Sequence, residues 1–335
     1  LVLAMTLLLV FGETRRDPEF FPAMWIWVRR CFVATIVISM VVSAVLPIWE
    51  PHIDVDGYAR YRWFAVHPIP VGGMTGVAIL MLMGTKLGLS DRTIGRVWRL
   101  LAILAVPALA VALVATRTRG GLLAFVFGAL VLLALAPRGP AKRLGTMALG
   151  VIVLGLTMAL ATPAGQQVAE RVLTRGQTTE QITSLSQRTE LMAIAGDLFA
   201  ERPLFGHGYI MAGPLFTTYF EWAGDGHNVL VEIGVDMGIA GLVVFLALLA
   251  VSVVAFVRAW RSRRSSALRS VAPEIAAMFV LIILMGVISP GIGGHVGYEA
   301  VGFLLFVTFA DVYRTSTRLE AGAAAKSGLT SVASR

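Results

Sequence analysis

The sequence has little charge and almost no cysteine. Only 14% of its 335 residues are charged, whereas 57% are hydrophobic and the mean hydropathy is +0.79. Soluble domains usually contain about 25% charged residues. The single cysteine, Cys31, excludes an intramolecular disulfide. The composition therefore excludes an ordinary soluble domain and predicts a polytopic membrane protein.

Several common functional motifs are also missing. The sequence contains neither a Walker nor a Rossmann glycine pattern, no G-x-S-x-G elbow, and no His or Cys pair at zinc-ligand spacing. The net charge of +8 does not indicate nucleic-acid binding, because Lys and Arg gather in short segments between apolar runs. That distribution is typical of membrane orientation signals.

The apolar runs predict an all-α bundle with about eight full transmembrane helices and a clipped one at the N-terminus. The runs are 1–11 (partial), 31–49, 67–89, 99–116, 120–137, 145–162, 228–257, 271–290 and 295–313. Residues 1–162 and 227–313 thus form the membrane part, and residues 163–226 form one large loop. The tail 314–335 is expected to be cytoplasmic and disordered.

The basic residues set the orientation. When residues 12–30 are placed in the cytoplasm, twenty of the 28 Lys and Arg residues fall inside. The eight outside are all arginines, which suggests a purpose other than orientation. They are Arg60, Arg62, Arg117, Arg119, Arg171, Arg175, Arg188 and Arg202.

The large outer loop contains a predicted helix near 185–201, which Pro203 ends. Its apolar face is expected to lie on the membrane part. Arg188 falls in its first turn, where a cation opposes the helix dipole, so an anion nearby would help to explain it. A solvated salt bridge with Glu190 or Asp197 is the alternative. Similarly, Arg117 and Arg119 in the turn TRTRGG could simply reach lipid headgroups.

The segment HNVLVEIGVDMG carries the last group of candidates. Asn228, Glu232 and Asp236 lie at i, i+4 and i+8, so they form one polar stripe on a membrane helix. A carboxylate in the bilayer costs on the order of 2.5–3.5 kcal/mol unless it is paired or wetted. For the two carboxylates we favour a role in helix packing, and for His227 a role in chemistry. If the carboxylates act on the histidine, Glu232 or Asp236 would set the tautomer of its ring. Asp54 and Asp56 in HIDVDG favour a solvated turn, and the alternative is that this D-x-D pair holds a divalent cation.

The segments TRTRGGLLAF, RTELMAIAGDLFAERPLFGHGY and HNVLVEIGVDMGIAGLVVF, in this order on one predicted face, resemble the O-antigen ligase and polymerase superfamily. The resemblance implies an inverting GT-C-type glycosyltransferase in the bacterial cytoplasmic membrane, with its active face outside. It implies a polyprenyl-diphosphate glycan donor, a glycan or glycolipid acceptor, and no nucleotide, metal or other cofactor.

The resemblance also assigns residues. In the family pattern, an arginine follows the turn between two membrane helices, and Arg119 matches it. Arg188 matches an arginine on the helix of the outer loop. His227 matches a histidine that directly precedes an asparagine. TRTRGG departs from the family pattern, which leaves open whether Arg117 or Arg119 acts. The remaining candidates for binding substrate are Arg60, Arg62, Arg117, Asn228, Glu232 and Asp236.

The chemistry is consistent with these residue types. Arginine binds diphosphate oxygens in a bidentate manner, and an imidazole can take a hydroxyl proton near neutral pH. A transporter or glycolipid flippase is the alternative, motivated by Glu232 and Asp236. However, such folds often contain inverted repeats, and the sequence has none.

Overall fold

The computed structural model describes most of the helical part of the chain. The described residues are 12–14, 16–17, 19–46, 52–53, 59–62, 66–86, 96–137, 139, 142–143, 145–147, 150, 158, 161–163, 167, 188–220, 224–262, 266–289, 291 and 297–333. The helices are α2 (Phe20–Val45), α3 (Pro68–Lys86), α4 (Arg96–Ala115), α5 (Arg119–Leu135), α9 (Arg188–Glu201), α10 (Ala212–Tyr219), α11 (Val229–Ser262), α12 (Ser266–Gly286) and α13 (Tyr298–Ala333).

The prediction of a helical fold is confirmed. The described part adds only a two-residue antiparallel pair, β1 (His52–Ile53) with β2 (Ala59–Arg60). Among the described residues, three segments are long and apolar enough to cross a bilayer, namely α2, α11 and Leu268–Gly286 of α12. The chain is therefore a multi-pass membrane protein. Most of the predicted span 145–162 lies outside the described residues.

The start of α2 differs from the prediction. The helix begins at Phe20, within the segment that was predicted to be a cytoplasmic connection. Trp25 and Arg29 are buried there, and both donate to the buried Glu274 of α12, over 2.9 Å and 3.2 Å. Residues 20–28 carry no charge and Arg29 has a partner inside the bundle, so the helix begins before the predicted span.

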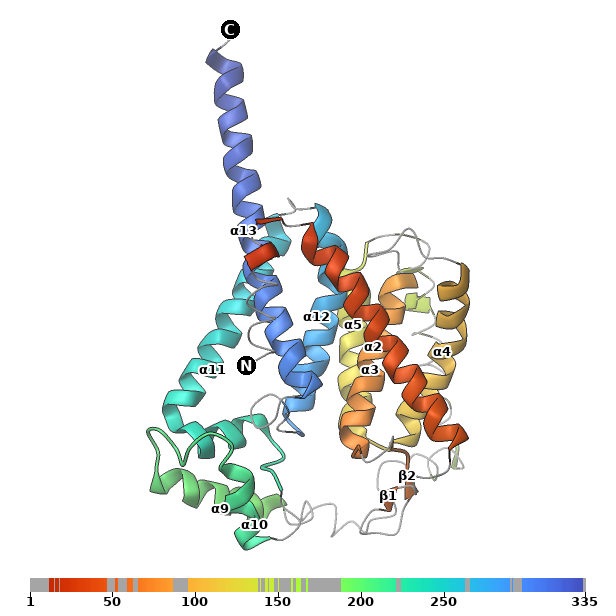
Figure 1. Ribbon diagram of the computed structural model, residues 1–335, viewed down its shortest axis with the longest axis vertical. Helices are drawn as coiled ribbons and strands as arrows, with labels where there is room; N and C mark the ends of the chain where they lie inside the picture. The colour runs from red at the N-terminus through yellow and green to blue at the C-terminus, as the bar shows by residue number, and fades with distance from the viewer. Residues whose placement is uncertain are drawn as a thin grey trace.

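The C-terminal segment also differs from the prediction. Helix α13 continues past residue 313 and reaches Ala333, so the tail expected to be disordered is helical. Its composition explains this, because LEAGAAAK is rich in alanine and other good helix formers. In Figure 1 this part of α13 projects beyond the rest of the bundle.

The helices pack around α12. It contacts α5, α3, α13 and α2, and its apolar residues are largely buried, whereas α11 packs mainly on α13. One end of the molecule carries β1, β2, the α4–α5 turn, α9 and α10 (Figure 1). The other end carries the start of α2, the connection from α11 to α12, and the C-terminus. The distribution of Lys and Arg in the sequence had assigned these same two groups of segments to opposite sides of the membrane.

Candidate active site

Helix α11 is broken at Gly238, where the sequence predicted a continuous span over 228–257. Gly238 has φ 63° and ψ −159°, which interrupts the helical hydrogen bonds. The N–H groups of Ile239 and Ala240 instead donate to the carbonyls of Pro203 (2.8 Å) and Leu204 (3.1 Å). A Cβ atom at 238 would lie 2.6 Å from both of those residues, so only glycine permits this approach. The chain after α9 is thereby attached to the break.

Asp236 holds the same segment from the other side. Its buried carboxylate accepts hydrogen bonds from the backbone N–H groups of Ile210 (3.0 Å) and Ala212 (2.6 Å). Ile210 has φ 62°, which is strained for a β-branched residue. The carboxylate therefore stabilises a turn that the local sequence disfavours.

Glu232 performs a similar task one helical turn earlier. Its buried carboxylate accepts a hydrogen bond from the Gly226 N–H over 2.7 Å, just before His227. Both carboxylates of the predicted stripe thus accept hydrogen bonds from backbone N–H groups of the chain before α11. A role in helix packing and direct contact with a substrate both stay predictions.

His227 is held in an unusual conformation. Its φ is 49°, in the left-handed region that few non-glycine residues adopt. One oxygen of Asp225 lies 2.5 Å from the ring Nδ1 and also accepts the backbone N–H of His227 over 2.8 Å. Asp225 therefore fixes both the backbone and the ring of His227, the ring through its Nδ1.

Asp225 was not among the residues predicted from the sequence. The sequence suggested Glu232 or Asp236 as the group that sets the tautomer of the His227 ring, and both lie in α11, which begins after the histidine. The available signal was the spacing Asp225-Gly-His227, since an aspartate side chain often bonds the backbone two residues on. Asn228 follows and caps α11, because its Oδ1 accepts the Leu230 N–H over 2.8 Å.

The candidate arginines occupy different settings. Arg117 is exposed with φ 50° in the α4–α5 turn, and Arg119 is the partly buried first residue of α5. Thr118 between them is buried, and its hydroxyl donates to the Pro68 carbonyl over 3.2 Å. Arg62 is partly buried after β2. The side chains of Arg60 and Arg188 lie outside the described part.

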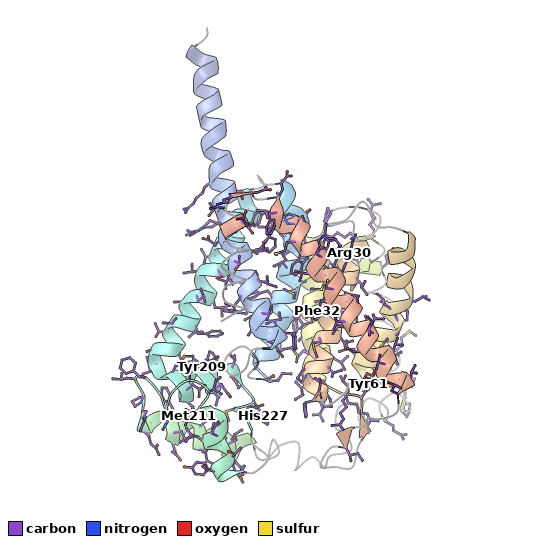
Figure 2. All side chains as sticks on the ribbon, in the orientation of Figure 1. Arg30, Phe32, Tyr61, Tyr209, Met211 and His227 are labelled. Carbon is purple, nitrogen blue, oxygen red and sulfur yellow. The ribbon has the colours of Figure 1, made fainter. Side chains whose placement is uncertain are left out.

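These elements share one end of the molecule. Figure 2 labels His227 there, on the side of the α9–α10 region toward the rest of the bundle, and Tyr61 at the same end. The Tyr61 N–H donates to the Ala115 carbonyl over 3.0 Å, which ties Tyr61 to the α4–α5 turn. Arg119 and His227 therefore come from segments at the same end of the molecule.

Two of the other histidines, His207 and His67, have local contacts. The His207 ring Nε2 lies 2.8 Å from the Leu198 carbonyl in the last turn of α9, so it closes that helix. His67 accepts the Ile69 N–H through its Nδ1. Within the described ranges, no three His, Cys, Asp or Glu side chains gather as a metal site. Asp54 and Asp56 lie outside these ranges.

Replacing Asp236 with alanine is expected to loosen the segment that follows α9. Each backbone donor left without a partner costs about 1–3 kcal/mol, so the amides of Ile210 and Ala212 should exchange hydrogen faster. Hydrogen-exchange mass spectrometry on peptides covering 203–212 measures this. The matched control is Asp197→Ala, which removes an exposed carboxylate from α9. Unchanged exchange in Asp236→Ala would contradict the assigned role.

Part of the chain matches a known protein family. Residues 100–246 match the family model described as O-antigen ligase. The match begins in α4 and includes Arg117, Arg119, Arg188, Asp225 and His227. No curated protein matches the chain. The chain is therefore a multi-pass membrane protein whose residues 100–246 are similar to the O-antigen ligase family.

Proposed function

We propose that this protein transfers a glycan from a polyprenyl-diphosphate carrier to an acceptor hydroxyl. It does so at the outer face of the bacterial cytoplasmic membrane, as an inverting GT-C-type glycosyltransferase that uses no metal or nucleotide. The acceptor is a glycan or a glycolipid. The observation that carries the proposal is the Asp225–His227 contact at the start of α11, within the matched family region.

His227 is the general base. Its Nε2 takes the proton of the acceptor hydroxyl while the hydroxyl oxygen attacks the anomeric carbon of the donor. The bond from that carbon to the diphosphate oxygen breaks, and its electron pair leaves with the lipid diphosphate. Attack from the face opposite the leaving group inverts the anomeric centre. Asp225 keeps Nδ1 protonated and stabilises the imidazolium that forms.

The arginines bind the leaving group. Arg119 and Arg188 donate to the diphosphate oxygens, and the charge that develops there in the transition state makes these bonds stronger. Arg60, Arg62 and Arg117 supply further positive charge at the same face. Asn228 contributes by capping α11, which keeps His227 at a fixed place at the helix start.

Transport was the alternative function, because Glu232 and Asp236 were expected deep in a membrane helix. Both carboxylates accept hydrogen bonds from backbone N–H groups of the chain before α11. Both also precede the break at Gly238. The feature that suggested transport is thus accounted for by contacts that hold the fold together.

Transfer by the purified protein tests the proposal. Protein in lipid nanodiscs receives an undecaprenyl-diphosphate oligosaccharide and a glycan acceptor, with EDTA and without any nucleotide. We expect a covalent product with an inverted anomeric linkage, identified by mass spectrometry and NMR. Dependence on a divalent metal or a nucleotide sugar would overturn the proposal. In proteoliposomes, movement of the labelled donor across the bilayer without covalent change would do so as well.

A further inference from the structure

The segment between α9 and α10 presents large apolar side chains to its surroundings. We refer to residues 203–211 as the anchor loop. Phe205 is 77% exposed, and Leu204 and Tyr209 are each 63% exposed. Ile210 and Met211 are exposed as well. Side chains of this size gathered on one loop form a surface that soluble proteins normally bury.

The backbone fixes where this loop lies along α11. The Pro203 and Leu204 carbonyls accept the N–H groups of Ile239 and Ala240, the first residues after the break. From this point, residues 239–262 continue as an apolar helix long enough to cross a bilayer. Val244, in its second turn, is 67% exposed, as expected for a lipid-facing side chain. The anchor loop therefore lies level with the start of a membrane span.

An apolar groove continues from α9 into that span. Met192 and Phe199 of α9 line it together with Leu242 and Leu246 of α11. The two leucines lie beyond Gly238, so the groove reaches from the extramembrane helix α9 into the membrane-spanning part of α11. Figure 2 shows Tyr209 and Met211 in the same region, beside the lower part of α11.

The chemistry of the loop matches a bilayer interface. Residues 203–211 contain no Asp, Glu, Lys or Arg. The ring of the one titratable imidazole, His207, is turned inward to the Leu198 carbonyl. Aromatic residues such as tyrosine are enriched where hydrocarbon meets headgroups. In addition, Asp236 holds Ile210 in a strained backbone conformation, in which the Ile210 side chain is exposed. A binding partner for that side chain, such as the membrane interface, would explain why the strain is kept.

We propose that the anchor loop inserts its apolar side chains into the membrane interface beside α11, so that the α9–α10 region is seated on the bilayer. The inference depends on α11 crossing the membrane and not on the proposed transfer reaction. Insertion of the anchor loop would fix the distance of the Asp225–His227 pair from the bilayer. Asp236 binds the anchor loop and Glu232 binds the backbone next to His227, so both segments are held by the same stretch of α11.

Spin labels can locate the loop directly. In a Cys31→Ser background in nanodiscs, nitroxide labels are placed at Phe205→Cys and, separately, at Tyr209→Cys. The control is Asp197→Cys, an exposed charged position on α9. We expect both loop labels to collide more with oxygen, which concentrates in the bilayer, than with a water-soluble nickel chelate. The control label should show the reverse order.

Two results would overturn the proposal. If the nickel chelate reaches the loop labels as readily as the control label, the loop lies in water. If both reagents are excluded from the loop labels, a protein surface such as a second copy of the chain covers them. Two loop positions are used so that one poorly folded variant still leaves a decisive measurement. Neither readout requires glycan transfer, so the proposed function is tested separately.

Discussion

Replacing His227 with alanine is expected to reduce glycan transfer by about 10²–10⁴-fold, the range that a general base contributes. The acceptor hydroxyl would keep its proton as it attacks, because the removed Nε2 is the group assigned to take it. Initial rates with saturating donor and acceptor measure the loss in kcat. Binding of the donor should change little, since we propose that arginines hold the diphosphate.

His67→Ala is the matched control, because it removes an exposed histidine from the same end of the molecule. It should retain near-normal activity. Asp225 gives a second check on the mechanism. Asp225→Ala removes the acceptor that fixes the ring and its backbone, whereas Asp225→Asn keeps an oxygen that can accept both bonds. The asparagine variant should therefore be more active than the alanine variant. Full activity in His227→Ala would remove the assigned base.

The spans that the sequence predicted well are those that an apolar run alone defines. Residues 67–89 and 120–137 were predicted, and α3 and α5 occupy Pro68–Lys86 and Arg119–Leu135. Proline starts the first, and a glycine pair follows the first residue of the second. The start of α2 could not be read in this way, because the burial of Arg29 depends on Glu274, far away in the chain.

The site was predictable in its residue types but not in its hydrogen bonds. The spacing of Glu232 and Asp236 placed them on one face of a helix. Their partners are backbone N–H groups of Gly226, Ile210 and Ala212, and no side-chain pattern shows which N–H group a fold will leave without a helical partner. The break in α11 was similarly hidden, since a glycine in an apolar run equally suits close helix packing. The role of Gly238 becomes clear only from the structure, where the backbone of Pro203 and Leu204 lies too close to allow a Cβ atom.

Arg119→Ala is expected to reduce kcat/KM for the donor by about 10²–10³-fold, comparable to the loss of one group that stabilises transition-state charge. Arg119→Lys should restore only part of this activity, because an ammonium lacks the planar fork that binds two oxygens at once.

Arg117→Ala is the matched control, two residues away in the same turn. Arg117 is exposed, whereas Arg119 is partly buried at the start of α5. Because a partly buried side chain has less conformational freedom to lose on binding, we expect Arg119 to be the better clamp. A larger loss in Arg117→Ala than in Arg119→Ala would reverse this assignment and place the diphosphate at the exposed arginine.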